Sequence, residues 1–137
     1  MEGFKVVAEV PVRFSDTDGL GHVNNAVYLS YLESARVDYL REILGAKKIE
    51  ELGVIIARVE IDYKSPAFHH ETMLVGCRVE EIGGSSIKMD YRIEDKDTGR
   101  LVALAKSVLV AYDYELARPT RVSDDWRQRM EDFDGIS

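Results

Sequence analysis

The spacing of the apolar residues changes along the chain, and the order of these changes limits the fold more than any other feature. Apolar residues alternate in residues 6–14, which is the period of a strand. In residues 24–44 they recur at steps of three and four, which is the period of a helix. Strand patterns then return in four segments. Residues 55–63, 73–79 and 87–93 alternate, and residues 101–112 are apolar on both faces apart from Lys106 and Ser107. The predicted order is therefore one strand, one long helix and four strands.

This order predicts an α+β domain in which one long helix lies across an antiparallel sheet and both bury an apolar face. Gly83-Gly84 and residues 97–99 are predicted turns, so three of the strands form consecutive hairpins. Pro11 cannot donate to a neighbouring strand, and we expect it at a sheet edge or a bulge. The last strand is apolar on both faces, which indicates a central strand covered on both sides.

Helix boundaries and short elements complete the prediction. Gly45 is a plausible C-cap of the long helix. Residues 47–52 fit a short helical turn, and residues 123–133 fit a short amphipathic C-terminal helix. We find no internal repeat or linker, so a single domain spanning residues 1–137 is the simplest interpretation.

Composition excludes several classes of function. No apolar run approaches the roughly 20 residues of a membrane span, and no signal peptide is recognisable at the N-terminus. Cys77 is the only cysteine, so an intrachain disulfide is impossible. We therefore expect a cytoplasmic protein with no membrane partner. The net charge of -7 argues against nucleic acid as the main partner, because contacts with phosphate dominate that affinity.

The loop before the long helix carries the most informative chemistry. Asp16 and Asp18 lie two residues apart in a glycine-rich segment that leads into the helix N-terminus. Free backbone N–H groups at such an end can stabilise negative charge that develops on an oxygen. A carboxylate nearby can act as a nucleophile or a general base. The arrangement suits acyl transfer, but capping of the helix, with Asn24 as the N-cap, explains the same residue types.

A metal site is the other interpretation of this loop, with Asp16, Asp18 and His22 as ligands. The D-x-D start resembles a calcium-binding loop. Counted from Asp16, however, the fifth position is Leu20 and the twelfth is Val27, where that motif needs an oxygen ligand and a glutamate. We therefore expect no metal.

The same segment resembles the signature of the 4-hydroxybenzoyl-CoA thioesterase-like branch of the hotdog enzymes. The matching pattern is Arg13-Phe14-x-Asp16-x-Asp18-x-x-Gly21-His22-Val23-Asn24-Asn25-x-x-Tyr28-x-x-Tyr31-x-Glu33-x-x-Arg36. Asp62-Tyr63-x-x-Pro66-Ala67 and Gly83-Gly84-Ser85-Ser86 also look familial, and the resemblance covers about residues 6–114. It implies a hotdog fold, with one long helix against a five-stranded antiparallel sheet. It also implies an acyl-CoA thioesterase that needs no cofactor, because the CoA thioester is the substrate.

Transferred position by position, the resemblance makes Asp18 the catalytic carboxylate and the backbone N–H of Asn25 the oxyanion donor. Asp16 and His22 are further catalytic candidates. Asp16 equally fits a role in ordering the loop, and for His22 a structural role is the favoured interpretation. Candidate substrate-binding residues are Gly19, Asn24, Tyr28, Arg58, Gly84, Ser85 and Ser86. Tyr28 also fits the helix core.

The CoA end departs from the family pattern. In the aryl-CoA branch, the turn equivalent to Gly83-Gly84-Ser85 carries basic residues that meet the nucleotide phosphates, and this turn has none. Backbone N–H groups and the hydroxyls of Ser85 and Ser86 can still contact phosphate or pantetheine. Arg58 is a candidate cation, although it also fits a plain surface charge.

Three alternatives stay open. The thioester carrier is CoA or an acyl carrier protein, and a non-catalytic acyl-CoA-binding module is a third possibility, which the presence of Asp18 disfavours. A hotdog dehydratase is disfavoured because the loop and helix lack that family's His and acid pair. The resemblance further implies a homodimer with sites at the subunit boundary, or a homotetramer.

Overall fold

The computed structural model describes residues 1–45 and 53–136. Its elements are β1 (Val6–Pro11), two 3-10 turns η1 (Phe14–Asp16) and η2 (Asn25–Val27), α1 (Tyr28–Leu44), β2 (Val54–Tyr63), β3 (Thr72–Ile82), β4 (Ser86–Asp95), β5 (Leu101–Asp113), β6 (Arg118–Pro119) and α2 (Asp124–Asp134). The predicted helical turn at residues 47–52 lies outside the described residues.

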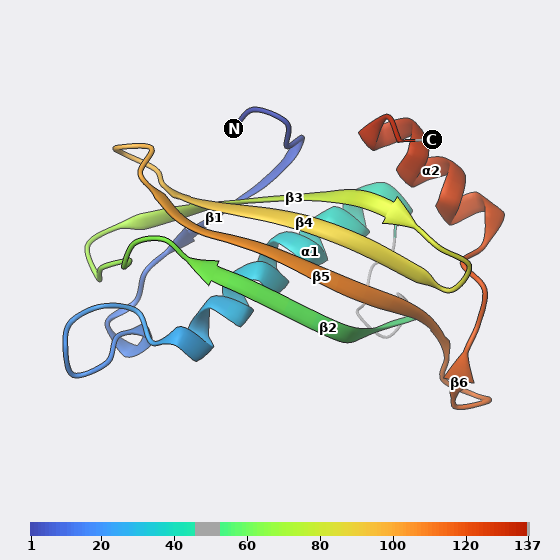
Figure 1. Ribbon diagram of the computed structural model, residues 1–137, viewed down its shortest axis with the longest axis horizontal. Helices are drawn as coiled ribbons and strands as arrows, with labels where there is room; N and C mark the ends of the chain where they lie inside the picture. Colours follow the sequence, from blue (N-terminus) through green and yellow to red (C-terminus); the bar gives the residue numbers. More distant parts are fainter. Residues whose placement is uncertain (46–52, 137) are drawn as a thin grey trace.

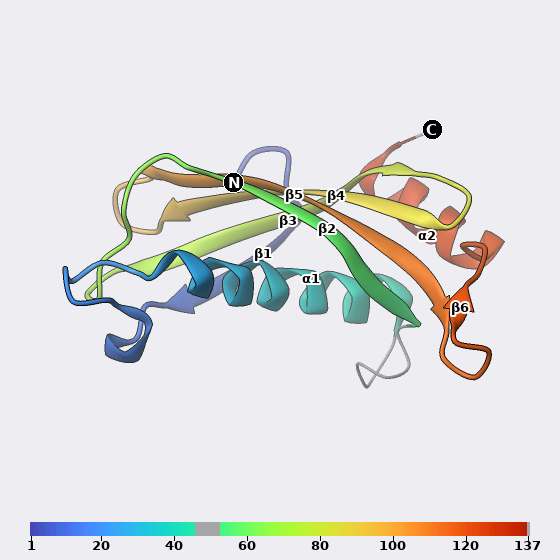
Figure 2. The ribbon, with the colours of Figure 1, turned by 60° about the horizontal axis from the view of Figure 1, so that its bottom comes forward.

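The strands form one antiparallel sheet in the order β1-β3-β4-β5-β2, and the two-residue β6 pairs with β5. The long helix α1 lies across one face of this curled sheet (Figures 1 and 2). The predicted α+β architecture, with one long helix against five antiparallel strands, is confirmed. The consecutive hairpins β3-β4-β5 are also as predicted.

The sequence sets both ends of α1. The side chain of Asn24 accepts a hydrogen bond from the N–H of Ala26 and caps the turn η2, which leads into the helix. Gly45 ends the helix in the left-handed conformation, with a φ of 70°, which glycine adopts without strain. The buried stripe of α1 consists of Tyr28, Tyr31, Leu32, Ala35, Tyr39, Leu40 and Ile43.

The inner face of the sheet supplies the other half of the core. Alternate residues of β3 and β4 are fully buried there, namely Met73, Val75, Cys77, Val79, Ile87, Met89, Tyr91 and Ile93. Each such side chain contributes about 1.5–3 kcal/mol by leaving water. The strand β5 is central, but from Ala103 onward its fully buried residues lie only on this inner face. Leu104, Val108 and Val110 on the outer face are half-buried, because α1 covers one side of the sheet alone.

The strand β1 is an edge strand and ends earlier than its alternation predicts. Pro11 is its last residue, in the edge position expected for a residue without an N–H. The chain then turns through η1, so Phe14 leaves the sheet and its side chain is 76% exposed. The apolar period therefore continued past the end of the strand.

The predicted C-terminal helix is present as α2, with the hydroxyl of Ser123 accepting a hydrogen bond from the N–H of Trp126 as its N-cap. It lies beside the part of β3 that extends past β1 (Figure 1). There the carboxylate of Asp134 accepts hydrogen bonds from the N–H of Val79 and the hydroxyl of Tyr39. Neither helix of the described chain has the length and apolar character needed to cross a membrane.

Candidate active site

The loop that carries Asp18 is held in shape by its own backbone. Thr17 and Val23 form an isolated antiparallel bridge, and the N–H of Asp18 donates to the carbonyl of His22 at 2.9 Å. Gly21 closes the turn with a φ of 88°. These contacts fix the backbone on either side of the candidate carboxylate.

The carboxylate of Asp18 is ordered but accessible. Its Oδ1 accepts a hydrogen bond from the N–H of Leu20 at 2.8 Å. Its Oδ2 lies 3.6 Å from Nδ1 of His22, and the two side chains are 33% and 36% exposed. One oxygen is therefore fixed by the loop while the other faces a titratable neighbour and solvent. This is the environment that a carboxylate needs to reach a bound substrate.

Asp16 has the opposite environment. Its side chain is buried and accepts hydrogen bonds from the backbone N–H and guanidinium of Arg13 and from the hydroxyl of Tyr31, at 2.8–3.0 Å. Burial by itself would raise the pKa of Asp16, but these hydrogen bonds outweigh it and hold the pKa below its usual value. The Asp16 carbonyl also accepts from the N–H of Asn24. These contacts support a role in ordering the loop.

The neighbouring loop between β2 and β3 supports the Asp18 loop. The N–H of Val23 donates to the carbonyl of Ala67, and His22 forms an isolated bridge with Phe68. The loop between β2 and β3 is in turn held by Arg100, whose guanidinium donates to both carboxylate oxygens of Glu71 at 2.8 Å. The sequence analysis did not identify this ion pair.

The first turn of the helical segment presents the amide predicted to bind an oxyanion. Within residues 1–45 and 53–136, no acceptor is bonded to the N–H of Asn25. The carbonyl of the same residue accepts from the hydroxyl of Tyr63 at 3.0 Å. The side chain of Asn24 is engaged as the N-cap, so capping accounts for this residue without a bound substrate. The amide of Asn25 is thus available at a helix start, where the dipole favours negative charge.

A groove of about 410 Å³ lies between the start of the helical segment and the edge strand β2. It is lined by Asn25, Ala26, Leu29, Val59, Ile61 and Tyr63. Tyr28 is buried beneath it, with its hydroxyl accepting from the N–H of Ala67 and its ring edge-on to that of Tyr63. Tyr28 therefore belongs to the core that supports the groove.

The residues proposed for the CoA end lie elsewhere. The turn with Gly84, Ser85 and Ser86 joins β3 to β4 at the end of the sheet opposite the Asp18 loop (Figure 1). Since β3 has 11 residues, its length separates the two places by about 35 Å. Arg127 of α2 donates to the carbonyl of Gly83, so a basic side chain reaches this turn from another element. A single chain does not bring this turn to Asp18.

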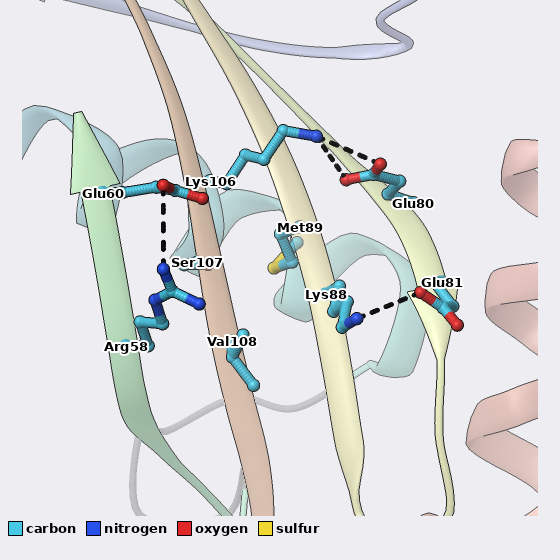
Figure 3. A pocket seen from close by; sticks show the side chains of 9 residues that line it. All are labelled: Arg58, Glu60, Glu80, Glu81, Lys88, Met89, Lys106, Ser107 and Val108. Carbon is cyan, nitrogen blue, oxygen red and sulfur yellow. Dashed lines mark hydrogen bonds and ion pairs between the residues drawn. The ribbon is translucent and has the colours of Figure 1, made fainter. Parts of the chain in front are cut away.

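Arg58 lies on the outer face of the sheet, away from α1. A pocket of about 180 Å³ there is lined mainly by charged side chains (Figure 3). Their pairs are Arg58 with Glu60, Lys88 with Glu81 and Lys106 with Glu80. The structure therefore does not place Arg58 near Asp18. Gly19 lies in the Asp18 loop, and a Cβ there would meet no atom within 4 Å.

Among residues 1–45 and 53–136, no group of three or more His, Cys, Asp or Glu side chains is placed to hold a metal ion.

Comparison with known proteins gives one consistent result. The model of the thioesterase-like superfamily matches residues 12–130. A thioesterase from Thermus thermophilus, solved in complex with coenzyme A and Zn, is 38% identical, with a TM-score of 0.90 over 98% of each chain. The long-chain acyl-CoA thioesterase FadM of Escherichia coli (strain K12) is 25% identical over 125 residues, covering 90% of this chain and 95% of that protein. The chloroplastic acyl-acyl carrier protein thioesterase ATL3 of Arabidopsis thaliana is 27% identical over 128 residues, covering 91% and 67%.

The chain therefore belongs to the thioesterase-like superfamily. The resemblance seen in the sequence and the implied hotdog fold are both confirmed, and the protein is a thioesterase. This result removes the support for a non-catalytic module.

Of the six residues that line the groove, sequence reasoning gave a site role to Asn25 alone. Tyr63 appeared as a member of an alternating strand and of a segment that looks familial, and Leu29 was not assigned to any role. A signal for Leu29 was present, since it is a large apolar residue outside the buried stripe of the helix and is 47% exposed.

Proposed function

We propose that the protein hydrolyses acyl-CoA thioesters to a free acid and CoA, with Asp18 as nucleophile or general base and the N–H of Asn25 as oxyanion donor. The observation that carries this proposal is an accessible carboxylate in the loop that leads into a helix start whose amide has no acceptor among the described residues. The name of FadM and the coenzyme A bound to the Thermus thioesterase support CoA as the carrier.

In the general-base route, Asp18 takes a proton from water while the hydroxyl oxygen adds to the thioester carbonyl carbon. Charge then builds on the carbonyl oxygen, which accepts from the N–H of Asn25, and one such donor is worth about 3 kcal/mol. The intermediate collapses, the C–S bond breaks, and the proton held by Asp18 passes to the departing thiolate. In the nucleophilic route, the carboxylate of Asp18 adds to the carbonyl carbon, and the C–S bond breaks to give a mixed anhydride and the thiolate of CoA. Water then cleaves the anhydride to the free acid and the protonated Asp18, whose proton passes to the thiolate.

The decisive experiment compares wild type with Asp18→Asn and Asp18→Ala on a panel of acyl-CoAs. We expect kcat to fall by about 10²–10⁴ in both variants, which is the usual contribution of an acid or base. Asp113→Asn is the matched control, because Asp113 also accepts a hydrogen bond from the N–H two residues on, at 2.9 Å. Equal rates for wild type and the Asp18 variants would remove the assignment.

The carrier is the second question. An acyl carrier protein is an acidic partner and needs a basic docking surface, whereas this chain has a net charge of -7. The likeness to ATL3 keeps this candidate worth testing. We expect kcat/KM to be higher for an acyl-CoA than for the same acyl group on a carrier protein, and the reverse ranking would favour the carrier.

We also propose that the working unit is a homodimer joined along β2, or a tetramer of such pairs. The structure describes β2 as pairing with β5 on one side, which leaves its other side able to pair with a second copy. The groove beside Asn25 runs along this strand, so a partner there would complete its wall.

A further inference from the structure

The walls of the groove beside Asn25 are mainly apolar. Leu29 of α1 faces Val59 and Ile61, which alternate on the inner side of β2 and are partly buried against the core. Its polar groups are at one end, where the hydroxyl of Tyr63 is already bonded to the carbonyl of Asn25. The rest of the wall offers an acyl group only apolar contacts.

Covalent geometry connects this groove to the proposed chemistry. If the N–H of Asn25 holds the thioester oxygen, the acyl chain starts within one bond of that oxygen. Asn25 itself lines the groove, so one of the two substituents of the reacting carbon can lie along Leu29, Val59 and Ile61, and these apolar side chains suit the acyl chain rather than the polar CoA. A hydroxylated aromatic acyl group would lose hydrogen bonds to water here without a replacement.

We propose, resting on the function proposed above, that this groove is the acyl site and that it selects an unbranched aliphatic chain. Each methylene that enters the groove raises kcat/KM about fourfold, until the chain reaches the end of the groove.

The test measures kcat/KM for saturated acyl-CoAs of two to twelve or more carbons, and for benzoyl-CoA and 4-hydroxybenzoyl-CoA. Leu29→Trp shortens the groove, so we expect it to lower kcat/KM on long chains at least tenfold more than kcat/KM on acetyl-CoA. Leu116→Trp is the matched control, because Leu116 is also an exposed leucine, at 59%, and lies outside the groove.

Several results would overturn the proposal. They are activity independent of chain length, a preference for 4-hydroxybenzoyl-CoA, or an equal loss on every substrate in Leu29→Trp. If acyl-CoAs are hydrolysed with dependence on Asp18 but without dependence on chain length, only this inference fails. If no acyl-CoA is hydrolysed, the proposed function fails with it.

A separate observation concerns Tyr63. Its hydroxyl donates to the carbonyl of Asn25 at 3.0 Å, and its ring packs edge-on against that of Tyr28 with centroids 5.1 Å apart. Tyr28 is buried and fixed by the N–H of Ala67. Tyr63 thus ties the edge strand β2 to the peptide next to the proposed oxyanion donor.

We infer that Tyr63 is a positioning residue for the N–H of Asn25. Removal of the hydroxyl in Tyr63→Phe keeps the ring contact with Tyr28 but removes the side-chain hydrogen bond to the carbonyl of Asn25. The amide then samples orientations that do not face the oxyanion, which lowers kcat rather than substrate binding.

Tyr114→Phe is the control, because the hydroxyl of Tyr114 donates to the carbonyl of Val54 at the other end of β2, at 2.8 Å. Both variants lose one hydroxyl bonded to a backbone carbonyl. We expect kcat to fall about tenfold in Tyr63→Phe with KM unchanged, and no change in Tyr114→Phe. An unchanged kcat in Tyr63→Phe, a rise in KM alone, or an equal loss in both variants would refute the role.

Discussion

Asp16 and Asp18 differ by two positions in the sequence, yet their side chains have opposite surroundings. The first is enclosed by Arg13 and Tyr31, and the second is a third exposed beside His22. A buried carboxylate with every oxygen bonded is fixed and ionised, which suits a loop anchor. An exposed one with a free approach suits contact with a substrate.

The surroundings of Asp16 lead to a prediction about stability. Folding lowers the pKa of Asp16, so the ionised carboxylate stabilises the folded state fully above its ordinary pKa of about 4. This stabilisation is lost as the pH falls through the pKa of Asp16 in the folded state. We expect Asp16→Asn to lower the free energy of unfolding by about 1–3 kcal/mol at pH 7. In urea unfolding, the difference from wild type should shrink below pH 4. A difference that is constant from pH 7 to pH 3 would contradict this origin.

Sequence alone could identify this loop but could not separate its carboxylates. Both are aspartates in a polar, glycine-rich segment, and capping and catalysis select the same residue types. The difference arises from Tyr31, which lies 15 residues away and reaches Asp16 only after α1 has folded over the loop. Tyr63 was missed for a similar reason, since its contact with Asn25 spans 38 residues.

At the scale of elements, the loop between β2 and β3 acts as the support of the Asp18 loop. Arg100 holds it by bonding to Glu71, the hydroxyl of Ser65 and the carbonyl of Pro66. The hydrogen bond from Arg100 is the main cause that holds the pKa of Glu71 below its usual value.

We expect Arg100→Gln to lower the free energy of unfolding by about 1–3 kcal/mol, because Glu71 is nearly buried and loses its bidentate partner. Loosening of the support should also lower kcat. A double-mutant cycle with Glu71→Gln measures the coupling by thermal or urea unfolding. The control cycle uses Lys106 and Glu80, an exposed pair expected to couple by less than about 1 kcal/mol. Similar coupling energies in both cycles would show that the pair of Arg100 and Glu71 stabilises the fold no more than an exposed ion pair does.

The order and type of the main elements followed from the period of the apolar residues, because helix and strand each bury one face. The exceptions have local causes. At β1, Pro11 and the turn η1 end the strand although the apolar period runs on to Phe14. The strand β6 has only two residues and carries no period. For β5, the outer face is apolar at Leu104, Val108 and Val110, yet α1 covers only the inner face.

For the whole molecule, the edge strand β2 leads to a prediction about assembly. Its ten residues include Ile55 and Ile56, which are 38% and 45% exposed. We expect sedimentation to give the mass of two chains or of a multiple of two. A charge in Ile56→Lys should shift the equilibrium toward single chains, since edge charges block strand pairing. Leu116→Lys is the control, and a single-chain mass for wild type would exclude the proposed dimer.

The two edges of the sheet differ in how well they can pair with another strand, and this difference limits how many copies can join. On the β1 side, the strand is short and ends at Pro11, and beyond it Asp134 occupies the N–H of Val79. On the other side, β2 offers a long border. If only one edge of the sheet can pair with another copy, assembly stops at two copies, because neither outer edge of the pair can accept a further strand. We therefore expect removal of the C-terminal helix, which frees the N–H of Val79, to make the protein prone to polymerise, as measured by light scattering.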